Sequence, residues 1–191
     1  MTGRESFNRF NKIINVLVVL FSLFGRRGNH FLLKLFRNTN GKLGLLLRYI
    51  FVKNTAKSVG NNVSIQPGVF VFNLKNMELG NNVSIHPMCY IDAAGGIKIG
   101  SNVSIAHATT LISTNHTWDN VDLPIKYNPE TFAEITIEDD VWIGCGVRIL
   151  AGVTISSRSV VAAGAVVNKS FENNALIGGV PAKLLKTINE K

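Results

Sequence analysis

A period of six residues governs the apolar positions in the C-terminal part of the chain. Aliphatic residues stand at every sixth position from Ile137 to Val167, namely at 137, 143, 149, 155, 161 and 167. Small or polar residues usually follow each of them. An α-helix repeats every 3.6 residues and a strand every two, so neither element explains this pattern. A repeat of six predicts a triangular parallel coil, in which each rung has three short strands whose aliphatic residues point inward.

A related repeat with a longer period precedes this one. The segments VGNNVSIQP, LGNNVSIHP and IGSNVSIAH begin at Val59, Leu79 and Ile99, which are 20 residues apart. Each of these rungs therefore has two residues more than three repeats of six, and we expect a small loop in each. Glycine and asparagine suit the corners because they accept positive φ. A β-sandwich would need alternating strands and hairpin turns. The pattern thus predicts an all-β solenoid of parallel strands, and the period leaves its handedness open.

The period of six is interrupted between Leu111 and Ile137. We expect a loop at about residues 113–135 to project from the solenoid there. Projecting loops of this kind usually carry the functional residues of a rigid scaffold. The loop opens with His116, which makes this histidine the first candidate for chemistry.

Residues 1–57 differ in character from the repeats. Three apolar clusters, at 13–24, 31–36 and 43–51, are flanked or interrupted by Arg and Lys and are spaced as in helices. The longest has twelve residues, whereas a bilayer span needs about 20. We therefore predict a basic, apolar helical extension over residues 1–57, a β-helix over residues 58–185, and a tail over residues 186–191.

The positive charge of the chain belongs to the extension. The whole chain has a net charge of +8, but residues 1–57 hold eleven Lys or Arg and one acid, a charge of +10. The main domain is therefore slightly acidic, and nucleic acid is not an expected partner. We expect the extension to contact anionic headgroups at a membrane surface. Packing on the β domain or on another subunit is the alternative, and a cleavable signal is a third. The expected location is cytoplasmic, at the inner face of the plasma membrane.

From Val59 to Leu185 the sequence resembles the hexapeptide-repeat acetyltransferases. The resemblance is strongest to the branch that includes galactoside, maltose, nodulation-factor and capsule-polysaccharide O-acetyltransferases. Besides the repeats, it rests on the segments TLISTNHTWDN, ITIEDDVWIGCGVRILAGVTI and GGVPAKLLK. It implies a left-handed β-helix, a homotrimer with threefold symmetry, and acetyl-CoA as co-substrate without a metal.

Acetyl transfer from a thioester to a hydroxyl needs a base for the hydroxyl proton and donors for the oxyanion of the tetrahedral intermediate. Histidine suits the first task because its pKa lies near neutrality. The resemblance implies that His116 is this base and that the backbone N–H of Cys145 is the oxyanion donor. A backbone donor does not depend on its side chain, so a cysteine is acceptable there. We expect the thiol of Cys145 to be a small buried group and not a nucleophile.

The resembling enzymes bind the acyl donor in a groove between two prisms. The resemblance assigns to this groove Trp142, Gly144, Ala163, Gly164, Lys169, Lys183 and Lys186. The lysines match basic positions near the phosphates of the coenzyme, and a solvated surface charge is the alternative for each. The family often has arginine at the position of Lys183, so the geometry there is open.

The acceptor side departs from the family pattern. The candidate acceptor-binding residues are His86, Met88, Asp92 and Asn115, with turn shaping as the preferred interpretation of Asn115. The family usually has an asparagine near the position of Met88, and its N-terminal helical segment differs from this one. We therefore expect the acceptor to be a cell-surface polysaccharide or its lipid-linked precursor, and not a small free galactoside or maltose.

Two other functions stay open. One is an N-acyltransferase acting on an amino-sugar nucleotide or a drug-type acceptor, and the other is a metal-dependent or non-enzymatic protein on the same fold. His86, His107 and His116 would be the zinc ligands of such a protein, but their spacing does not resemble that of the metal-dependent relatives, and we expect His107 to be structural. Cys89 and Cys145 match no metal-binding spacing either.

Overall fold

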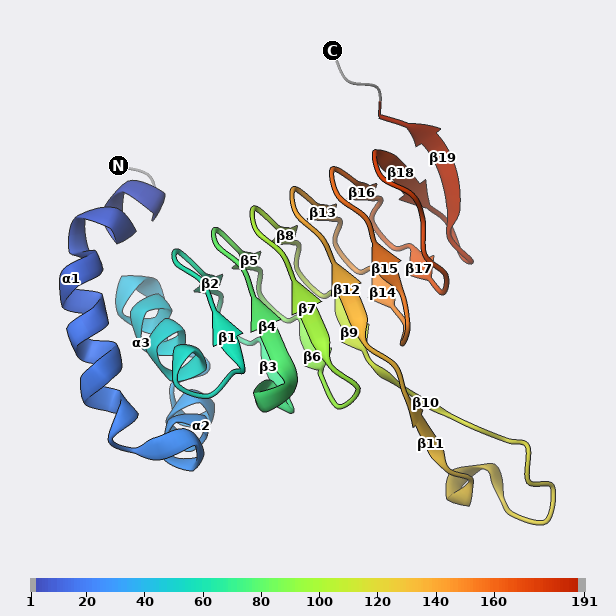
Figure 1. Cartoon of the computed structure of the whole chain (residues 1–191), viewed down its shortest axis with the longest axis horizontal. Coiled ribbons are helices and arrows are strands. Elements are labelled where there is room, and N and C mark those ends of the chain that lie inside the picture. The colour runs from blue at the N-terminus through green and yellow to red at the C-terminus, as the bar shows by residue number, and fades with distance from the viewer. Residues whose placement is uncertain (1–2, 189–191) are drawn as a thin grey trace.

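The computed structural model describes residues 3–188; the first two residues of the predicted extension and the last three of the predicted tail lie outside the described residues. Parallel strands wind into a three-faced prism, and helices cover its N-terminal end (Figure 1). The prediction of a left-handed β-helix with a short helical extension is confirmed.

Three sheets form the faces of the prism. Face A consists of β1 (Ser58–Val59), β4 (Met77–Leu79), β7 (Ile97–Ile99), β12 (Ile135–Ile137) and β15 (Thr154–Ile155). Face B consists of β2 (Ser64–Ile65), β5 (Ser84–Ile85), β8 (Ser104–Ile105), β13 (Trp142–Ile143), β16 (Val160–Val161), β18 (Ala175–Gly178) and β19 (Lys183–Thr187). Face C consists of β3 (Phe70–Phe72), β6 (Tyr90–Asp92), β9 (Thr110–Ile112), β14 (Arg148–Ile149) and β17 (Val166–Val167). A short 3-10 helix, η1 (Leu74–Asn76), follows β3.

Aliphatic residues stack inside the prism with the spacing that the sequence predicts. All six positions from 137 to 167 in steps of six are buried. Val59 lies opposite Leu79 in the early coils, a register of 20 residues, and Ile137 lies opposite Ile155 in the late ones, a register of 18. Each fully buried aliphatic side chain contributes about 1.5–3 kcal/mol. The stacked interior is therefore the main source of stability.

The corners use the left-handed region of backbone space. After face A, Asn62, Asn82 and Asn102 have φ values of 54°, 56° and 58°. Their side-chain amides bridge successive coils, at 3.0 Å and 2.9 Å. After face B, Met88 and Ala108 have φ values of 62° and 58°. Neither methionine nor alanine favours this region, and the left-handed conformation of each costs roughly 1–2 kcal/mol of folding free energy.

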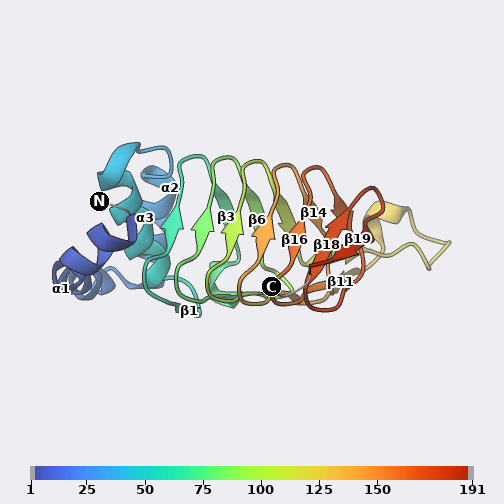
Figure 2. The ribbon, with the colours of Figure 1, turned by 90° about the horizontal axis from the view of Figure 1, so that it is seen from above.

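Three helices close the N-terminal end of the prism: α1 (Gly3–Ser22), α2 (Gly25–Leu35) and α3 (Gly41–Lys53). They contain most of the three apolar clusters; Leu23, Phe24 and Phe36 lie just beyond the ends of α1 and α2. Helix α3 packs against β1 and β2, and α1 and α2 pack on α3 (Figures 1 and 2). Among the described residues no single helix is long and apolar enough to cross a bilayer; α1 and α2 pass that test only together, as a pair bent by 114°.

An arm of residues 113–134 leaves the prism where face C ends and returns at face A. It contains β10 (Thr114–His116), the short 3-10 helix η2 (Ile125–Tyr127) and β11 (Glu130–Phe132). The buried Asn128 ties its distal part together, because its side-chain amide donates to the carbonyl groups of Asn120, Leu123 and Pro124 and its oxygen accepts from the N–H of Asn120. Figure 1 shows the arm extending well beyond the prism.

At the C-terminal end, β19 returns antiparallel to β18. The predicted tail at 186–191 therefore starts too early, since Lys186 and Thr187 belong to this strand. The physical reason is that the edge of β18 has backbone groups to satisfy, and the chain satisfies them by folding back.

Candidate functional site

Face B presents an outward row of side chains that leads to β19. Trp142 on β13 lies between Ser104 and Val160 in this row, which continues through Leu176 to Lys186. Trp142 is 54% exposed. A hollow of about 330 Å³ lies beside it, bordered by Ser104 and Val160 among others. An exposed indole on a flat sheet offers an apolar platform to a ligand.

The corner between faces B and C contains the Gly144–Cys145 peptide, which is held by a hydrogen bond from inside the prism. Thr109 is fully buried inside the prism, and its hydroxyl donates a hydrogen bond of 3.0 Å to the carbonyl oxygen of Gly144. This carbonyl group therefore points into the prism. In a trans peptide the N–H points opposite to the C=O. The N–H of Cys145 consequently points out of the prism.

The neighbouring coils indicate that this N–H takes no part in the β-ladder. The corner residues stack in the order Pro67, Pro87, His107, Cys145 and Ala163. Two of them are prolines, which have no N–H to donate. Among the backbone hydrogen bonds of residues 3–188, none has the N–H of Cys145 as donor. The corner thus offers a fixed donor to a developing negative charge.

Close packing at this corner requires small residues. A Cβ atom on Gly144 would lie 2.6 Å from the nitrogen of Ala163 in the next coil. Ala163 and Gly164 are both exposed, and Gly164 has a φ of 73°. The Nη1 of Arg148 donates to three carbonyl groups of the same corner at 2.9–3.2 Å. Sequence reasoning missed Arg148, because its role depends on where those carbonyl groups converge.

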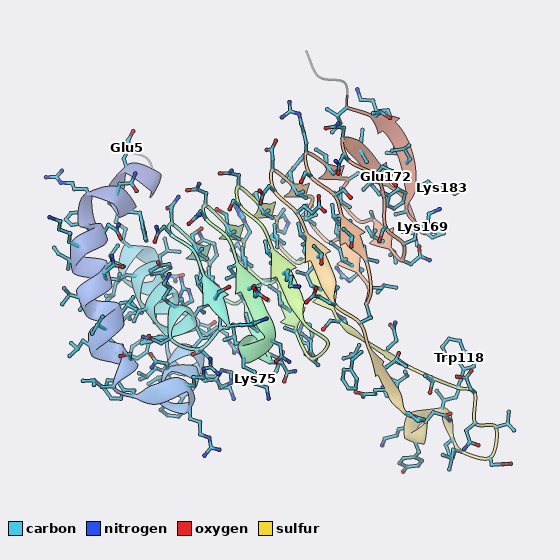
Figure 3. All side chains as sticks on the ribbon, in the orientation of Figure 1. Glu5, Lys75, Trp118, Lys169, Glu172 and Lys183 are labelled. Atoms are coloured by element: carbon cyan, nitrogen blue, oxygen red, sulfur yellow. The ribbon has the colours of Figure 1, made fainter. Side chains whose placement is uncertain are left out.

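The three candidate lysines gather toward the C-terminal end of the prism. Lys183 and Lys186 lie on β19, and Lys169 lines the same hollow of about 380 Å³ as Lys183. Glu172 lines this hollow as well, and Figure 3 shows its side chain near Lys169 and Lys183. All three lysines are exposed. Face B thus joins Trp142 to a basic region suited to phosphate groups.

His116 lies at the base of the arm, opposite Glu130 in the β10–β11 pair. Its Nε2 is 3.5 Å from the Oε1 of Glu130, and both side chains are about half exposed. Sequence reasoning missed Glu130. The only sign of it in the sequence was its position near the far end of the segment that interrupts the repeats. Only the register of the β10–β11 hairpin shows that Glu130 lies opposite His116.

His116 and Cys145 occupy different corners of the same prism. The Cys145 corner joins faces B and C, whereas the arm leaves where face C gives way to face A. The arm leads away from the prism, with Trp118 far from Lys169 and Lys183 (Figure 3). A single chain therefore does not bring the candidate base and the candidate oxyanion donor together.

The four candidate acceptor residues are also divided. His86 and Met88 are exposed at the corner between faces B and C, one coil below His107. Asp92 lies at the end of β6, and its Oδ1 accepts hydrogen bonds from Asn73 and from the N–H of Ala94. This oxygen has a structural task, which the sequence did not indicate.

Asn115 does not shape a turn, and that interpretation is wrong. It lies within β10, opposite Thr131 in the hairpin, and its side chain is exposed. The turn of the arm falls beyond it, where Asn128 supplies the hydrogen bonds that hold the loop together.

Cys145 is only partly buried, so the expectation of a buried thiol is wrong; the corner row to which it belongs faces outward. Cys89 is the buried cysteine, its Sγ lies 3.2 Å from the carbonyl oxygen of Ala106, and burial raises its pKa. Over residues 3–188, no group of three or more His, Cys, Asp or Glu side chains is arranged to hold a metal ion.

The chain is similar to known proteins in sequence. Residues 134–169 match the family described as bacterial transferase hexapeptide (six repeats). Over 145 residues the chain is 34% identical to the galactoside O-acetyltransferase of Escherichia coli (strain K12). The aligned region covers 75% of this chain and 70% of that protein. 

Solved structures resemble the whole architecture. A galactoside acetyltransferase in complex with coenzyme A has a TM-score of 0.77 at 31% identity, covering 86% of this chain and 80% of that one. A hexapeptide-repeat-containing acetyltransferase from Vibrio cholerae O1 biovar eltor, complexed with acetyl coenzyme A, has a TM-score of 0.73 at 25% identity and covers both chains completely.

Proposed function

The chain belongs to the hexapeptide-repeat acetyltransferases, and we propose that this acetyl-CoA-dependent enzyme transfers the acetyl group to a hydroxyl of a saccharide. Two findings support the saccharide acceptor: the galactoside O-acetyltransferase to which the chain is similar acts on a saccharide, and the similarity covers 70% of that protein. The observation that carries the transfer chemistry is the outward N–H of Cys145, held by Thr109 beside the exposed Trp142.

Acetyl-CoA lies along face B in this proposal. Trp142 packs against the coenzyme, while Gly144, Ala163 and Gly164 let its narrow arm approach the backbone closely. Lys169, Lys183 and Lys186 bind its phosphate groups as point charges. The support for this path is the continuous row from Trp142 to Lys186.

His116 acts as the general base. Its imidazole takes the proton of the saccharide hydroxyl as the oxygen attacks the thioester carbon. The N–H of Cys145 stabilises the resulting oxyanion. When the C–S bond breaks, the imidazolium returns the proton to the thiolate of coenzyme A. Glu130 is a positioning residue that orients the ring and stabilises the imidazolium, and Thr109 is a positioning residue for the Cys145 peptide.

The site is built by two chains in a homotrimer. The separation of His116 from Cys145 within one prism supports this arrangement, as does the exposed apolar surface of the arm. Trp118, Val121, Ile125 and Tyr127 are each 64–91% exposed, which is unusual unless another surface covers them. In a ring with threefold symmetry, each arm would lie on the face of the next chain.

The acceptor is a cell-surface polysaccharide or its lipid-linked precursor. His86 and Met88, exposed at the groove corner, and Asn115 and Asp92, near the base of the arm, are the proposed contacts. The exposure of His86 and Met88 at the corner row that continues to Cys145 supports this choice.

The reaction is tested by following thiol release from acetyl-CoA with saccharides as acceptors. We expect His116→Ala to lose at least about 100-fold in kcat, while the distant control His30→Gln on α2 keeps its activity. Unchanged turnover of His116→Ala would exclude the mechanism. Turnover with amino sugars alone would identify an N-acetyltransferase instead.

The shared site is tested by co-expressing two inactive chains. His116→Ala lacks the base, and Ala163→Trp fills the groove at an exposed position. Random mixing leaves about one quarter of the interfaces with one intact arm and one intact groove. We expect about that share of the wild-type activity, whereas a site within one chain would give none.

A further inference from the structure

The outer side of α1 is apolar where a surface helix is ordinarily polar. Five aliphatic side chains face outward along its C-terminal half and beyond its end. They are Ile13, Val16, Val19, Leu20 and Leu23, with exposed fractions of 60%, 67%, 69%, 53% and 82%. Exposed apolar groups that lie this close together mark an interaction surface.

The opposite side of α1 is already committed to the protein. Phe7 packs edge-on against Tyr49, and Phe21 packs against Phe51, with ring centroids 5.3 Å and 5.5 Å apart. The side chain of Asn54 donates to the carbonyl oxygen of Val18 at 2.9 Å. Rotation of α1 to hide its outer side would break all of these contacts. The apolar outer side is therefore a fixed feature.

The place of α1 in the molecule makes this surface accessible. Helix α3 lies against the first coil, and α1 packs on α3 at the N-terminal end of the prism (Figures 1 and 2). The arm and the β19 end lie toward the other end of the molecule (Figure 1). A flat partner could approach α1 without touching the proposed catalytic groove.

Basic side chains surround the apolar surface. Arg9 and Lys12 are exposed on α1, and Arg26 and Arg27 are exposed at the start of α2. Glu5 is the single acidic residue of the first 57. A second protein copy would bring the same positive charges together, whereas an anionic surface would neutralise them.

We propose that the outer side of α1 lies in the interface of an anionic phospholipid bilayer, with the helix axis parallel to the membrane. The aliphatic residues enter the boundary between headgroups and acyl chains, and the arginines and lysines remain among the phosphates. This mode needs no membrane-spanning segment. In the proposed trimer, parallel prisms would turn three such surfaces to one side and raise the avidity, but the surface itself does not depend on the reaction.

The test is flotation of the full-length protein with vesicles. One set mixes phosphatidylglycerol with phosphatidylcholine, and the other contains phosphatidylcholine alone. We expect binding to the first set, much weaker binding to the second, and release as salt is raised. Val19→Gln combined with Leu23→Gln should weaken binding about tenfold or more, and Arg26→Gln combined with Arg27→Gln should remove the salt dependence in part.

Asn15→Gln is the matched control, because Asn15 is an exposed polar residue of the same helix, and it should bind as the wild type does. Thermal unfolding should be unchanged in all variants, since the replaced side chains are exposed. Failure of the wild type to float with phosphatidylglycerol vesicles would overturn the proposal. Sedimentation gives a second such outcome. If the wild type has twice the mass of the Val19→Gln, Leu23→Gln variant, the surface binds a second copy of the protein, and the proposal is overturned.

Discussion

The hydroxyl of Thr109 donates a hydrogen bond from inside the prism to the carbonyl oxygen of Gly144, 3.0 Å away. The residues stacked above and below Thr109 are Val69, Cys89, Val147 and Ala165, and all are buried. A hydroxyl in this row is therefore an exception in an apolar interior. Burying it is favourable only because the bond is made, and the bond determines where the N–H of Cys145 points.

Replacing Thr109 by valine tests whether this bond serves the reaction. The shape of the side chain is kept, while the carbonyl group of Gly144 loses its partner. We expect kcat to fall about tenfold, less than the loss of a whole oxyanion donor, and the KM for acetyl-CoA to stay within about twofold. The free energy of unfolding should fall by about 1–3 kcal/mol.

Thr109→Ser is the control for this change, because it restores the hydroxyl and should recover most of kcat. If Thr109→Val lowers the unfolding free energy but leaves kcat unchanged, Thr109 stabilises the core and does not position the corner peptide.

Replacing Glu130 by glutamine tests the partner of His116. The side chain keeps its size but loses the negative charge that faces the imidazolium formed during transfer. We expect kcat to fall about tenfold, with little change in the KM for acetyl-CoA, as measured by thiol release. Glu134→Gln is the matched control, since Glu134 is an exposed carboxylate four residues along that pairs with Lys98 at 2.9 Å. Equal losses in both variants would argue against a special role for Glu130.

The two cysteines should differ in their reactivity. Burial raises the pKa of Cys89, so its thiolate is scarce near neutral pH, and its side chain is inaccessible. Cys145 is partly exposed at the groove corner. A thiol reagent should therefore modify Cys145 quickly and Cys89 only when the protein unfolds. Coenzyme A should slow the fast reaction, and peptide mapping by mass spectrometry identifies the residue. Absence of any protection by coenzyme A would place the donor groove elsewhere.

The sequence predicts the prism well and the site only in part, for a physical reason. A stacked core repeats one local environment, so its period is visible as aliphatic residues at Ile137, Ile143 and their successors. The partnership of His116 with Glu130 depends instead on a hairpin register across a long loop, which Asn128 helps to hold. The bond of Thr109 depends on a contact across coils, 35 residues away in sequence. Neither relationship produces a periodic signal.

The N-terminal helices are tied to the prism by a buried arginine. Arg48 on α3 is 1% exposed, and its Nε donates a hydrogen bond of 2.6 Å to the carbonyl oxygen of Ile65 on β2. Its Nη1 donates to the carbonyl oxygens of Phe36, Arg37 and Thr39, which follow α2. Burial lowers its pKa, but an arginine remains protonated near neutral pH. The guanidinium thus joins α2, α3 and the first coil.

Replacing Arg48 by methionine should weaken the attachment of α2 and α3 to the first coil. The apolar part of the side chain is retained, but the carbonyl groups of Ile65 and Thr39 lose their donor. Those of Phe36 and Arg37 lose one donor and keep a backbone N–H, from Thr39 and Gly68. We expect the free energy of unfolding to fall by about 3–5 kcal/mol, because buried carbonyl groups lose a charged donor, and the Tm to fall by about 10 °C, as measured by calorimetry. Arg158→Met is the matched control, because Arg158 forms an exposed ion pair with Asp140 at 3.0 Å and such pairs contribute at most about 1 kcal/mol. A loss for Arg48→Met as small as that of the control would mean that apolar contacts such as those of Phe51, and not the guanidinium, hold the helices to the first coil.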